Sequence, residues 1–345
     1  MVEKMKKPLS IILPIYNGVH IISYTLSLLK EQVIRNRDKV DLVLCDNAST
    51  DNTLKILEDI NIDNPFFSIV KYTEHVGIGE SISRSIENAT GEFVLLWSDD
   101  DIPSPTMIDT VLLYLAKYPQ IELLHFNRLT GFTEGKYGIG SLKVYKDSID
   151  PVGKLYENSE QFAIDHYQGM DFLSCDVIRK TAWEKGLAVY DKRHCGYEFI
   201  VPMLYGAKDA QNLFIEFPLC VHRASHRPRW VAKLPLYWLI GAPRMLVDMQ
   251  KHGIIHDWCS VWKESYYYKR SYKSYLGVIS HCLKDRKAYI PLLDEICSYQ
   301  YSWIRRITTR VIVRFFPLPL YNWMEKKMFG PNYVKDGNGS YPLIP

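Results

Sequence analysis

The sequence has no run of about 18 consecutive apolar residues, so it predicts no transmembrane helix. Its seven cysteines are an odd number and none stands in a Cys-x-x-Cys pair, which argues against a disulfide framework and a zinc knuckle. The first residues are charged and run directly into a strand-like segment, so we expect no signal peptide. Together these absences favour a cytoplasmic protein.

Strong charge of one sign is also lacking. The 345 residues carry a formal net charge of +3, which is too small to indicate a nucleic-acid partner. Internal repeats and low-complexity linkers are absent as well. Apolar residues are plentiful, at 47% of the chain, and this is enough for one large domain or two ordinary ones with a sizeable core.

Short apolar runs alternate with helical patterns four times in the first third of the chain. We expect strands at 9–15, 40–45, 67–70 and 93–97, each followed by a helix. This alternation predicts right-handed βαβ units, and hence an α/β fold with a mostly parallel, Rossmann-like sheet flanked by helices. Because ligands bind at the carboxyl ends of such strands, the polar clusters that follow them are the candidate site.

The fourth strand ends in three consecutive carboxylates, Asp99, Asp100 and Asp101. Pro103 and Pro105 follow and prevent the strand from continuing. A partly buried acidic triplet requires a cation because like charges repel, whereas a solvated turn that leads into a helix N-cap requires none. An isolated triplet is more often the solvated turn, and the sequence upstream favours the cation.

Four motifs follow one another before residue 102. They are Ile12-Leu-Pro-Ile-Tyr-Asn17, Asp46-Asn-Ala-Ser-Thr-Asp51, Gly77 with Ala89-Thr-Gly-Glu92, and Ser98-Asp-Asp-Asp101. In order and spacing they resemble glycosyltransferase family 2, whose GT-A fold binds a nucleotide-sugar with a divalent metal. The resemblance covers residues 8–230 and is fainter in its second half. Where the family often has a second acid, this chain has Asn47.

The resemblance implies a divalent cation, Mn²⁺ or Mg²⁺, and a pyrimidine nucleotide-sugar such as a UDP-sugar. A hard cation on carboxylate oxygens neutralises the diphosphate leaving group as the glycosyl bond breaks. By resemblance Asp101 ligates the metal, and Asp100 contacts ribose or metal-bound water. Asp99 shapes the turn, and Asp46 accepts a hydrogen bond from the imide N–H of the base.

The remaining donor-site candidates have alternatives of equal or greater weight. Tyr16, which shares a motif with Asn17, could cover the face of the base, but a core aromatic residue is equally expected. Pro14 is expected to be structural. Arg84 lies on the helix after Gly77 and could reach the diphosphate, although a solvated surface arginine is the more common case.

The second half has to supply a general base, because inverting transfer needs a carboxylate that removes the proton of the acceptor hydroxyl. Glu198, just before an apolar helix, stands where the family places this acid. Compensation of the helix dipole is the alternative, and Asp191 is the next candidate. His222 and His226 lie where the family often supplies a third metal ligand or a contact to the diphosphate, and His226 is preferred.

Residues 301–316 form a helical pattern in which Arg306, Arg310 and Arg314 make a stripe beside a mostly apolar arc. Residues 299–330 hold six Lys or Arg against one acid, Glu325. Such a segment can lie on an anionic membrane surface. The alternative is a helix that packs on the catalytic domain and leaves its arginines in solvent.

We therefore expect a GT-A domain at 1–230 and a helical, aromatic and basic extension at 231–345. The expected protein is a metal-dependent inverting glycosyltransferase that acts on a glycan or lipid-linked glycan in bacterial surface polysaccharide assembly, such as lipopolysaccharide O-antigen or capsule, in the cytoplasm or on the cytoplasmic membrane face. A nucleotidyltransferase is an alternative, but it usually has a Gly-rich loop with a lysine near the first strand, and none is present. A non-catalytic nucleotide-sugar-binding protein is the other alternative, against which Asp101 argues weakly.

Overall fold

The structure is a computed structural model that describes residues 6–62, 66–132, 141–144, 153–191, 197–223, 236–265, 268, 275–300 and 302–329. The chain divides into two compact units. The first comprises Met1–Lys192, Gly196–Arg227 and Asp248–His256, and the second comprises Arg193–Cys195, Pro228–Val247 and Asp257–Pro345. The domain boundary expected near residue 230 stays a prediction.

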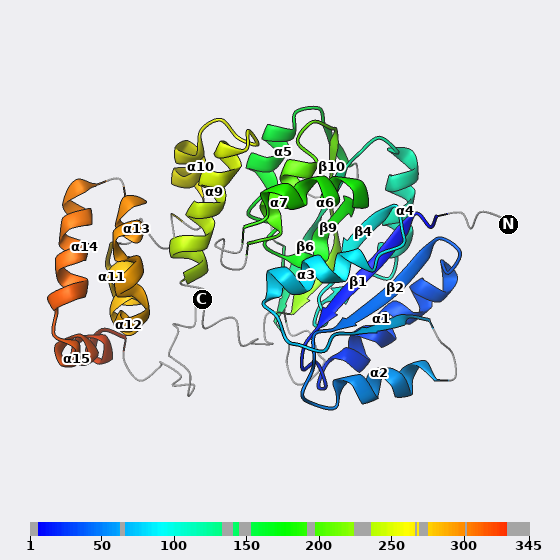
Figure 1. The fold of residues 1–345 in the computed structure, drawn as a ribbon, viewed down its shortest axis with the longest axis horizontal. Helices are drawn as coiled ribbons and strands as arrows, with labels where there is room; N and C mark the ends of the chain where they lie inside the picture. The colour runs from blue at the N-terminus through cyan, green and yellow to red at the C-terminus, as the bar shows by residue number, and fades with distance from the viewer. Residues whose placement is uncertain are drawn as a thin grey trace. The chain divides into compact units, whose positions relative to one another are not determined.

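The first unit is built on a ten-stranded sheet in which the described strands run in the order β3-β2-β1-β4-β9-β6-β10-β5, with β7 beside β6 and β8 beside β10 (Figure 1). The strands are β1 (Leu9–Ile15), β2 (Val40–Asp46), β3 (Ser68–Lys71), β4 (Phe93–Leu96), β5 (Ile102–Pro103), β6 (Leu123–Phe132), β7 (Ser141–Val144), β8 (Lys154–Tyr156), β9 (Asp176–Arg179) and β10 (Asn212–Arg223). The helices are α1 (Ile22–Arg35), α2 (Thr53–Asn61), α3 (Ile78–Glu87), α4 (Met107–Lys117), α5 (Ser159–His166), α6 (Lys180–Gly186) and α7 (Ile200–Gly206), with short η1 (Leu173–Cys175) and η2 (Leu187–Val189).

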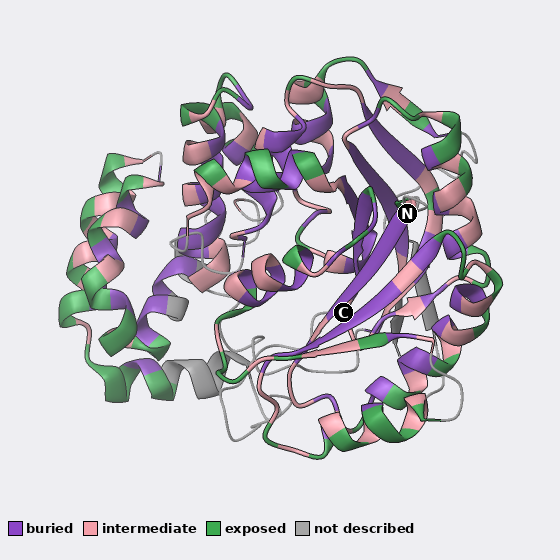
Figure 2. Cartoon of the chain, turned by 45° about the vertical axis from the view of Figure 1, so that its right-hand side comes forward, coloured by how far each residue is buried: buried purple, intermediate pink, exposed green. Residues whose placement is uncertain are grey.

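Strand β1 lies at the centre of the parallel half, with β2 on one side and β4 on the other, and β3 continues beyond β2. Alternate residues of a strand point to opposite faces. Leu9, Ile11, Leu13 and Ile15 accordingly share one core cluster with residues of α1, α2 and α4, while α3 packs on β1 as well. Strands β1, β2 and β4 are buried along almost their whole length, whereas the edge strand β3 is not (Figure 2). The predicted α/β architecture with a mostly parallel sheet flanked by helices is confirmed.

Gly91 fixes the approach of β4 to β1. A Cβ atom at Gly91 would lie 2.6 Å from the backbone nitrogen of Ser10, so no larger residue fits without a shift of the backbone. The buried Ser10 hydroxyl accepts hydrogen bonds from the backbone N–H groups of Gly91 and Thr90, at 2.8 and 3.1 Å. The motif 89–92 therefore holds the start of β4 in register with the central strand.

The second half of the sheet brings distant segments to the end of β4. Strand β9 inserts antiparallel between β4 and β6, so that η1, directly before β9, lies at the carboxyl end of β4. Strand β10 pairs with the two-residue β5 so that Val221 is opposite Ile102. The register of β10 shifts on both sides of Pro218, which has no N–H to donate to the ladder. Pro202 is tolerated because it is the third residue of α7, where the N–H has no intrahelical partner.

The second unit is helical. Its helices, with α9 at its border, are η5 (Tyr237–Gly241), α9 (Ala242–Lys251), α10 (Trp258–Glu264), α11 (Tyr275–Lys284), α12 (Arg286–Tyr289), η7 (Ile290–Leu292), α13 (Leu293–Ser298), α14 (Trp303–Phe315) and α15 (Leu318–Phe329). Ser302 caps α14 by accepting a hydrogen bond from the N–H of Arg305 at 3.4 Å. A small core joins α11 to α15 through Ile279, Leu283 and Tyr321. Among the described residues, no helix is long and apolar enough to span a bilayer.

Candidate active site

The candidate site is built on the carboxyl ends of β2, β1 and β4, which are neighbours in the sheet. Asp46 is the last residue of β2 and only 3% exposed. Its Oδ2 accepts a hydrogen bond from the N–H of Ser49 at 3.2 Å, whereas its buried Oδ1 has no hydrogen-bond partner. A buried carboxylate oxygen without a donor costs free energy. This oxygen is therefore suited to a ligand that brings its own N–H.

The loops after β1 and β2 are locked to each other. Asn17 has a φ of 55°, a left-handed conformation that asparagine tolerates better than most residues. Its Oδ1 accepts from the N–H of Thr50 at 2.8 Å, and its own N–H donates to the Ser49 hydroxyl at 2.9 Å. Asn47, which stands where the resembled family often has an acid, bonds both the N–H and the carbonyl of Val76 through its side chain. The polar motif residues thus preform the backbone around Asp46.

Tyr16 is half-buried and stacks on His75, with ring centroids 3.9 Å apart and an interplanar angle of 28°. No motif of the sequence indicated His75. Its Nδ1 lies 3.3 Å from the carbonyl oxygen of Asn47, so it is joined to the same loop cluster. The pair of rings forms an aromatic wall beside Asp46.

Pro14 lies within β1. It comes after Ile12, the last residue of β1 that pairs with β4.

Asp101 is the most deeply placed of the three acids, at 1% exposed, so the alternative of a solvated turn is wrong at this position. Its Oδ2 accepts a 2.6 Å hydrogen bond from the hydroxyl of Ser174 in η1, and that hydroxyl in turn accepts from the N–H of Ser98 at 2.8 Å. Burial raises the pKa of Asp101 to about 6, against the opposing effect of His222. Ser174 was not identified from the sequence, because η1 reaches Asp101 only through the antiparallel insertion of β9.

His222 comes next to Asp101 because β10 pairs with β5. The distance from His222 Nδ1 to Asp101 Oδ1 is 3.5 Å, and both atoms are buried without a hydrogen-bond partner. A carboxylate and an imidazole in this position suit a divalent cation such as Mn²⁺. Within the described part of the chain, however, no three His, Cys, Asp or Glu side chains converge as a metal site. His226, the histidine preferred from the sequence, lies outside the described residues.

Asp99 and Asp100 are half-buried beside Asp101. Burial, followed by the charges of Asp100 and Asp101, raises the pKa of Asp99 to about 8. The Ser98 hydroxyl donates to Asp100 Oδ1 at 2.5 Å. The three acids therefore differ in surroundings. Among the described residues, the carboxylate of Asp101 is the one of the three that accepts a hydrogen bond from a distant segment, whereas Thr25 of α1 donates to the backbone carbonyl of Asp99.

Glu198 lies in the turn before α7, far from the acidic turn in sequence. A Cβ atom at Gly79 would meet Glu198 Cβ at 2.7 Å and the Tyr190 hydroxyl at 2.9 Å, so glycine in the first turn of α3 makes room for both. Helix α3 follows β3, so its N-terminus belongs to the same edge of the sheet as Asp46. Burial and the charges of Glu198 and Glu80 raise the pKa of Tyr190 to about 12. This position is compatible with a general base and with an anion at a helix N-terminus.

Arg84 is engaged by acids of its own surroundings. Its Nη2 lies 2.6 Å from Glu80 and 3.3 Å from Glu74. These two ion pairs favour the surface arginine over the diphosphate contact. Asp191, the reserve candidate for the base, is half-exposed at the end of the segment that contains Tyr190.

The sequence of this part of the first unit matches the family model of glycosyl transferase family 2 over residues 10–146. This segment is a glycosyltransferase family 2 domain. The match starts in β1 and contains Asp46 and the whole acidic turn. It confirms the predicted family at the level of the domain, and with it the prediction of an enzyme.

Curated relatives of the family 2 domain are distant and align over part of their length. The putative glycosyltransferase EpsE of Bacillus subtilis is 23% identical over 143 residues, which are 41% of this chain and 49% of that protein. The glycosyltransferase GlyG of Streptococcus pneumoniae is 27% identical over 108 residues, 31% of this chain and 35% of its own. The chain thus spans at most about half the length of these relatives.

Solved structures resemble the chain over a greater length. Residues 1–349 of S. aureus TarS in complex with UDP-GlcNAc superimpose with a TM-score of 0.61 at 13% identity, covering 98% of this chain and 100% of that one. The mannosyltransferase PcManGT of Pyrobaculum calidifontis, in complex with GDP-Man and Mn²⁺, gives a TM-score of 0.51 at 14% identity, covering 91% and 89%. At these identities the likeness establishes the shared fold.

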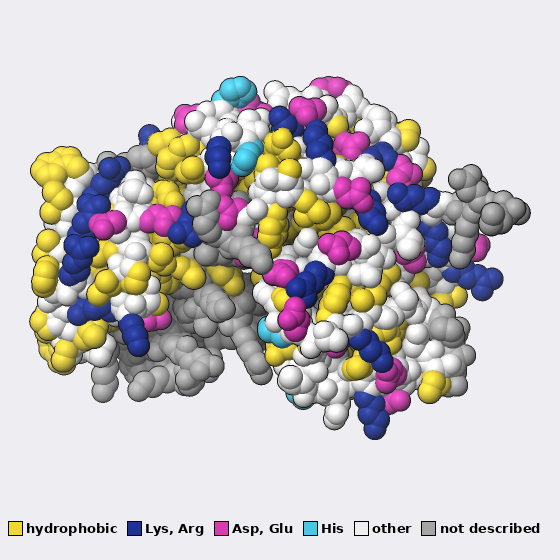
Figure 3. All heavy atoms as spheres, viewed as in Figure 1, with side chains coloured by type: hydrophobic (Ala, Val, Ile, Leu, Met, Phe, Trp, Pro, Cys, Tyr) yellow, Lys and Arg dark blue, Asp and Glu magenta, His cyan; other side chains and the backbone are white. Residues whose placement is uncertain are grey.

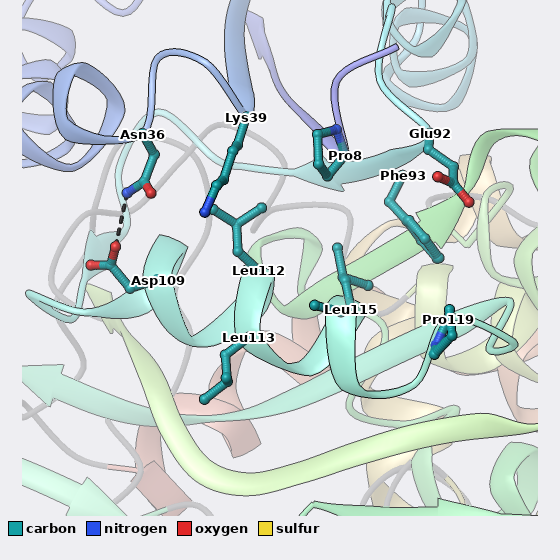
Figure 4. Close-up of a pocket in the computed structure, with 11 residues that line it drawn as sticks. Pro8, Asn36, Lys39, Glu92, Phe93, Asp109, Leu112, Leu113, Leu115 and Pro119 are labelled. Atoms are coloured by element: carbon teal, nitrogen blue, oxygen red, sulfur yellow. Dashed lines mark hydrogen bonds between the residues drawn. The ribbon is translucent and has the colours of Figure 1, made fainter. Parts of the chain in front are cut away.

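The family 2 domain also has a groove of about 600 Å³ far from the acidic turn. It is lined by Pro8 and Phe93 at the amino ends of β1 and β4, and by Leu112 and Leu115 of α4 (Figure 4). In Figure 4 the side chains of Asn36 and Asp109 meet at its rim, where they form a 2.9 Å hydrogen bond. Because it opens at the amino ends of the strands, this groove does not belong to the candidate site.

Proposed function

We propose that the protein transfers a sugar from a nucleotide-sugar, with inversion at the anomeric carbon, to a glycan acceptor. The observation that carries the proposal is a pair of buried carboxylates, Asp46 and Asp101, each with one oxygen that has no hydrogen-bond partner. They lie at the ends of β2 and of β4 with its following turn, one on each side of β1. A ligand with an N–H group at one end and a metal-bound diphosphate at the other would provide a partner for both carboxylate oxygens.

In this proposal Asp46 Oδ1 accepts the imide N–H of a pyrimidine base. The wall of Tyr16 and His75 covers one face of the base, and Asn17 keeps the two loops in place through Thr50 and Ser49. Support comes from the neighbouring folds, since TarS is known in complex with UDP-GlcNAc.

A divalent cation, Mn²⁺ or Mg²⁺, would be held by Asp101, with Asp100 and His222 as further ligands, directly or through water. When bound, it supplies positive charge that neutralises the departing diphosphate. Ser174 keeps the Asp101 carboxylate oriented through the 2.6 Å hydrogen bond. Histidine among the ligands favours Mn²⁺ over Mg²⁺, because imidazole suits transition metals better than it suits magnesium.

Glu198 acts as the general base in this proposal. It removes the proton of the acceptor hydroxyl while that oxygen attacks the anomeric carbon from the face opposite the leaving nucleoside diphosphate. Its place beside the first turn of α3, which Gly79 makes possible, keeps it at the carboxyl edge of the sheet.

For the acceptor we propose a growing surface polysaccharide, such as lipopolysaccharide O-antigen or capsule, carried on a lipid at the cytoplasmic face of the membrane. The family resemblance is the basis of this assignment. Acceptor specificity is tested by offering lipid-linked and free oligosaccharides to the purified protein in the presence of its donor.

The experiment that tests the donor and the metal is calorimetric titration of UDP, CDP and GDP, each with Mn²⁺, with Mg²⁺ and with EDTA. We expect binding of a pyrimidine diphosphate that depends on the metal and is lost in Asp101→Asn. The exposed Asp59 on α2 provides a matched control, since Asp59→Asn removes the same charge away from the site. Unchanged affinity in Asp101→Asn would contradict the metal assignment.

The same protein incubated with a panel of nucleotide-sugars separates the alternatives. A glycosyltransferase should hydrolyse its donor slowly in the presence of metal, whereas a non-catalytic binding protein should bind it and leave it intact. Release of pyrophosphate from a nucleoside triphosphate and a sugar phosphate would instead identify a nucleotidyltransferase.

A further inference from the structure

Helix α14 exposes most of its large apolar side chains. Five large apolar residues on one side of the helix are between 51% and 77% exposed: Trp303, Ile304, Ile307, Val311 and Phe315, which we call the outer face of α14. The opposite side carries Thr309 and Val313, both fully buried. A helix on a protein surface normally has the reverse arrangement, with its apolar side toward the core.

The apolar surface continues beyond the end of α14. Leu318, Leu320 and Trp323 on α15 are 38%, 45% and 55% exposed, whereas Tyr321 points into the small core of the unit. Scattered exposed apolar residues are normal on a soluble protein, but a contiguous group usually marks an interaction site. Tryptophan at both ends of the group is typical of side chains that lie at a boundary between apolar and aqueous surroundings.

The arginine stripe borders this surface. Arg310 Nε donates to Asp294 Oδ1 of α13 at 2.7 Å, and Arg314 Nη2 lies 3.7 Å from Asp294 Oδ2. Arg306 Nε donates to the carbonyl oxygen of Gln300 at 2.5 Å. The three arginines therefore line the edge between α14 and α13, and Figure 3 shows the column of basic side chains next to the apolar ones. Two of them share a single carboxylate, so the edge keeps net positive charge.

We propose that the outer face of α14, with Leu318, Leu320 and Trp323 of α15, is a contact surface for an anionic lipid bilayer. A helix that lies in the interface buries its apolar side among the acyl chains and keeps its cationic edge at the level of the headgroups. The sequence suggested the whole segment, with the arginine stripe and the apolar arc beside it, as a membrane contact. In the structure the apolar residues provide the main contact, and the arginines add electrostatic attraction to the headgroups.

The charge of the edge favours lipid over a second copy of the chain. In a twofold dimer the same patch meets itself, so two arginine edges would approach each other. Like charges that face each other are unfavourable, whereas anionic headgroups attract each basic residue near the surface. The surface does not depend on the proposed sugar transfer, because its binding partner can be offered without donor or acceptor.

The test is flotation of the full chain with vesicles of phosphatidylcholine, with and without phosphatidylglycerol. We expect the protein to float with the anionic vesicles, and the triple variant Ile307→Gln, Val311→Gln, Phe315→Gln to lose at least about tenfold in binding. The control replaces two equally exposed apolar residues of the first unit, Ile62→Gln and Leu113→Gln, which are 72% and 64% exposed. This control should float like the wild type.

The double variant Arg310→Gln, Arg314→Gln measures the electrostatic part. It should bind anionic vesicles about fivefold more weakly per charge at low salt, and the difference should shrink as salt is added. Circular dichroism melting of each variant verifies that the fold is kept. Failure of the wild type to float, or equal flotation of the apolar triple variant, would overturn the proposal. A wild-type dimer that the triple variant breaks in light scattering would assign the face to a second copy instead.

Discussion

The carboxyl edge of the sheet and the outer face of α14 depart from ordinary protein surfaces in opposite directions. At the sheet edge, Asp46 and Asp101 are 3% and 1% exposed although each has a carboxylate oxygen without a partner. On α14, Trp303 and Phe315 are 69% and 77% exposed although they are among the largest apolar side chains. Charge is buried in the first region, and hydrocarbon is left in water in the second.

Both arrangements reduce the stability of the chain on its own. A buried charge without full compensation and a row of exposed aromatic and aliphatic side chains each forgo free energy that other sequences would gain. Because native proteins are only marginally stable, such features are expected where an external partner compensates for them. The carboxyl edge of the sheet therefore indicates an ionic, hydrogen-bonding ligand. The outer face of α14 indicates an apolar surface with negative charge.

The largest effect should come from the base. Glu198→Gln keeps the shape of the side chain but cannot accept a proton, so turnover should fall by about 10²- to 10⁴-fold while the dissociation constant of the donor changes little. Single-turnover rates at saturating donor, beside calorimetric donor binding, measure the two quantities separately. Glu184→Gln on the exposed side of α6 is the control and should keep normal turnover.

A rate within about threefold of wild type would show that Glu198 only compensates a helix N-terminus. The variant should then lose about 0.3–1 kcal/mol of stability instead. In that case the base is sought at Asp191.

The parallel half of the sheet could be predicted from the sequence because its information is local. Each strand is a short apolar run followed by a polar turn and a periodic helix, and right-handed crossovers place the turns on one edge. That pattern alone predicts that Asp46 and Asp101 follow strands that end at the same edge of the sheet. The local pattern also located α14 to within two residues at each end.

The contacts of these residues could not be predicted from local patterns, because their partners arrive through pairing of distant segments. From the sequence, His222 is a candidate ligand only through the family resemblance, and Ser174 is not a candidate. Ser174 meets Asp101 only because β9 inserts antiparallel beside β4, and His222 does so only because β10 pairs with the two-residue β5. Two-residue strands leave no periodic signal. The sequence also could not predict which side of α14 is exposed to solvent. A helical pattern shows which residues share a side, but it does not show which side meets the core.

A smaller effect should follow from removing the serine that orients Asp101. Ser174→Ala deletes the 2.6 Å hydrogen bond to Asp101 Oδ2 and leaves the N–H of Ser98 without its acceptor. We expect metal-dependent binding of the nucleoside diphosphate to weaken by roughly tenfold, the equivalent of ~1.4 kcal/mol. The same titration as for Asp101→Asn measures it.

Ser174→Thr keeps the hydroxyl and should recover part of the binding if the added methyl group is accommodated. Binding in Ser174→Ala equal to that of wild type would show that Asp101 is held in place by its backbone, with no need for the serine.

The smallest effect concerns stability, and it has the opposite sign to the effect on binding. Without metal, the ionised Asp101 is buried with one unpartnered oxygen, and such a group destabilises the folded state. An asparagine there is neutral, its carbonyl oxygen can still accept from Ser174, and its amide can donate toward His222 Nδ1, which now lies 3.5 Å from Asp101 Oδ1. Asp101→Asn should therefore unfold in EDTA at a temperature equal to or a few degrees above that of wild type, corresponding to about 1–2 kcal/mol.

Adding Mn²⁺ and the nucleoside diphosphate should reverse the order, because only the wild type gains stability from binding. Thermal unfolding with and without these ligands, beside Asp59→Asn, measures both signs in one experiment. A variant that is clearly less stable than wild type in EDTA would mean that the Asp101 carboxylate is part of the structural framework, and the contrast between buried charge and exposed hydrocarbon would then rest on Asp46 alone.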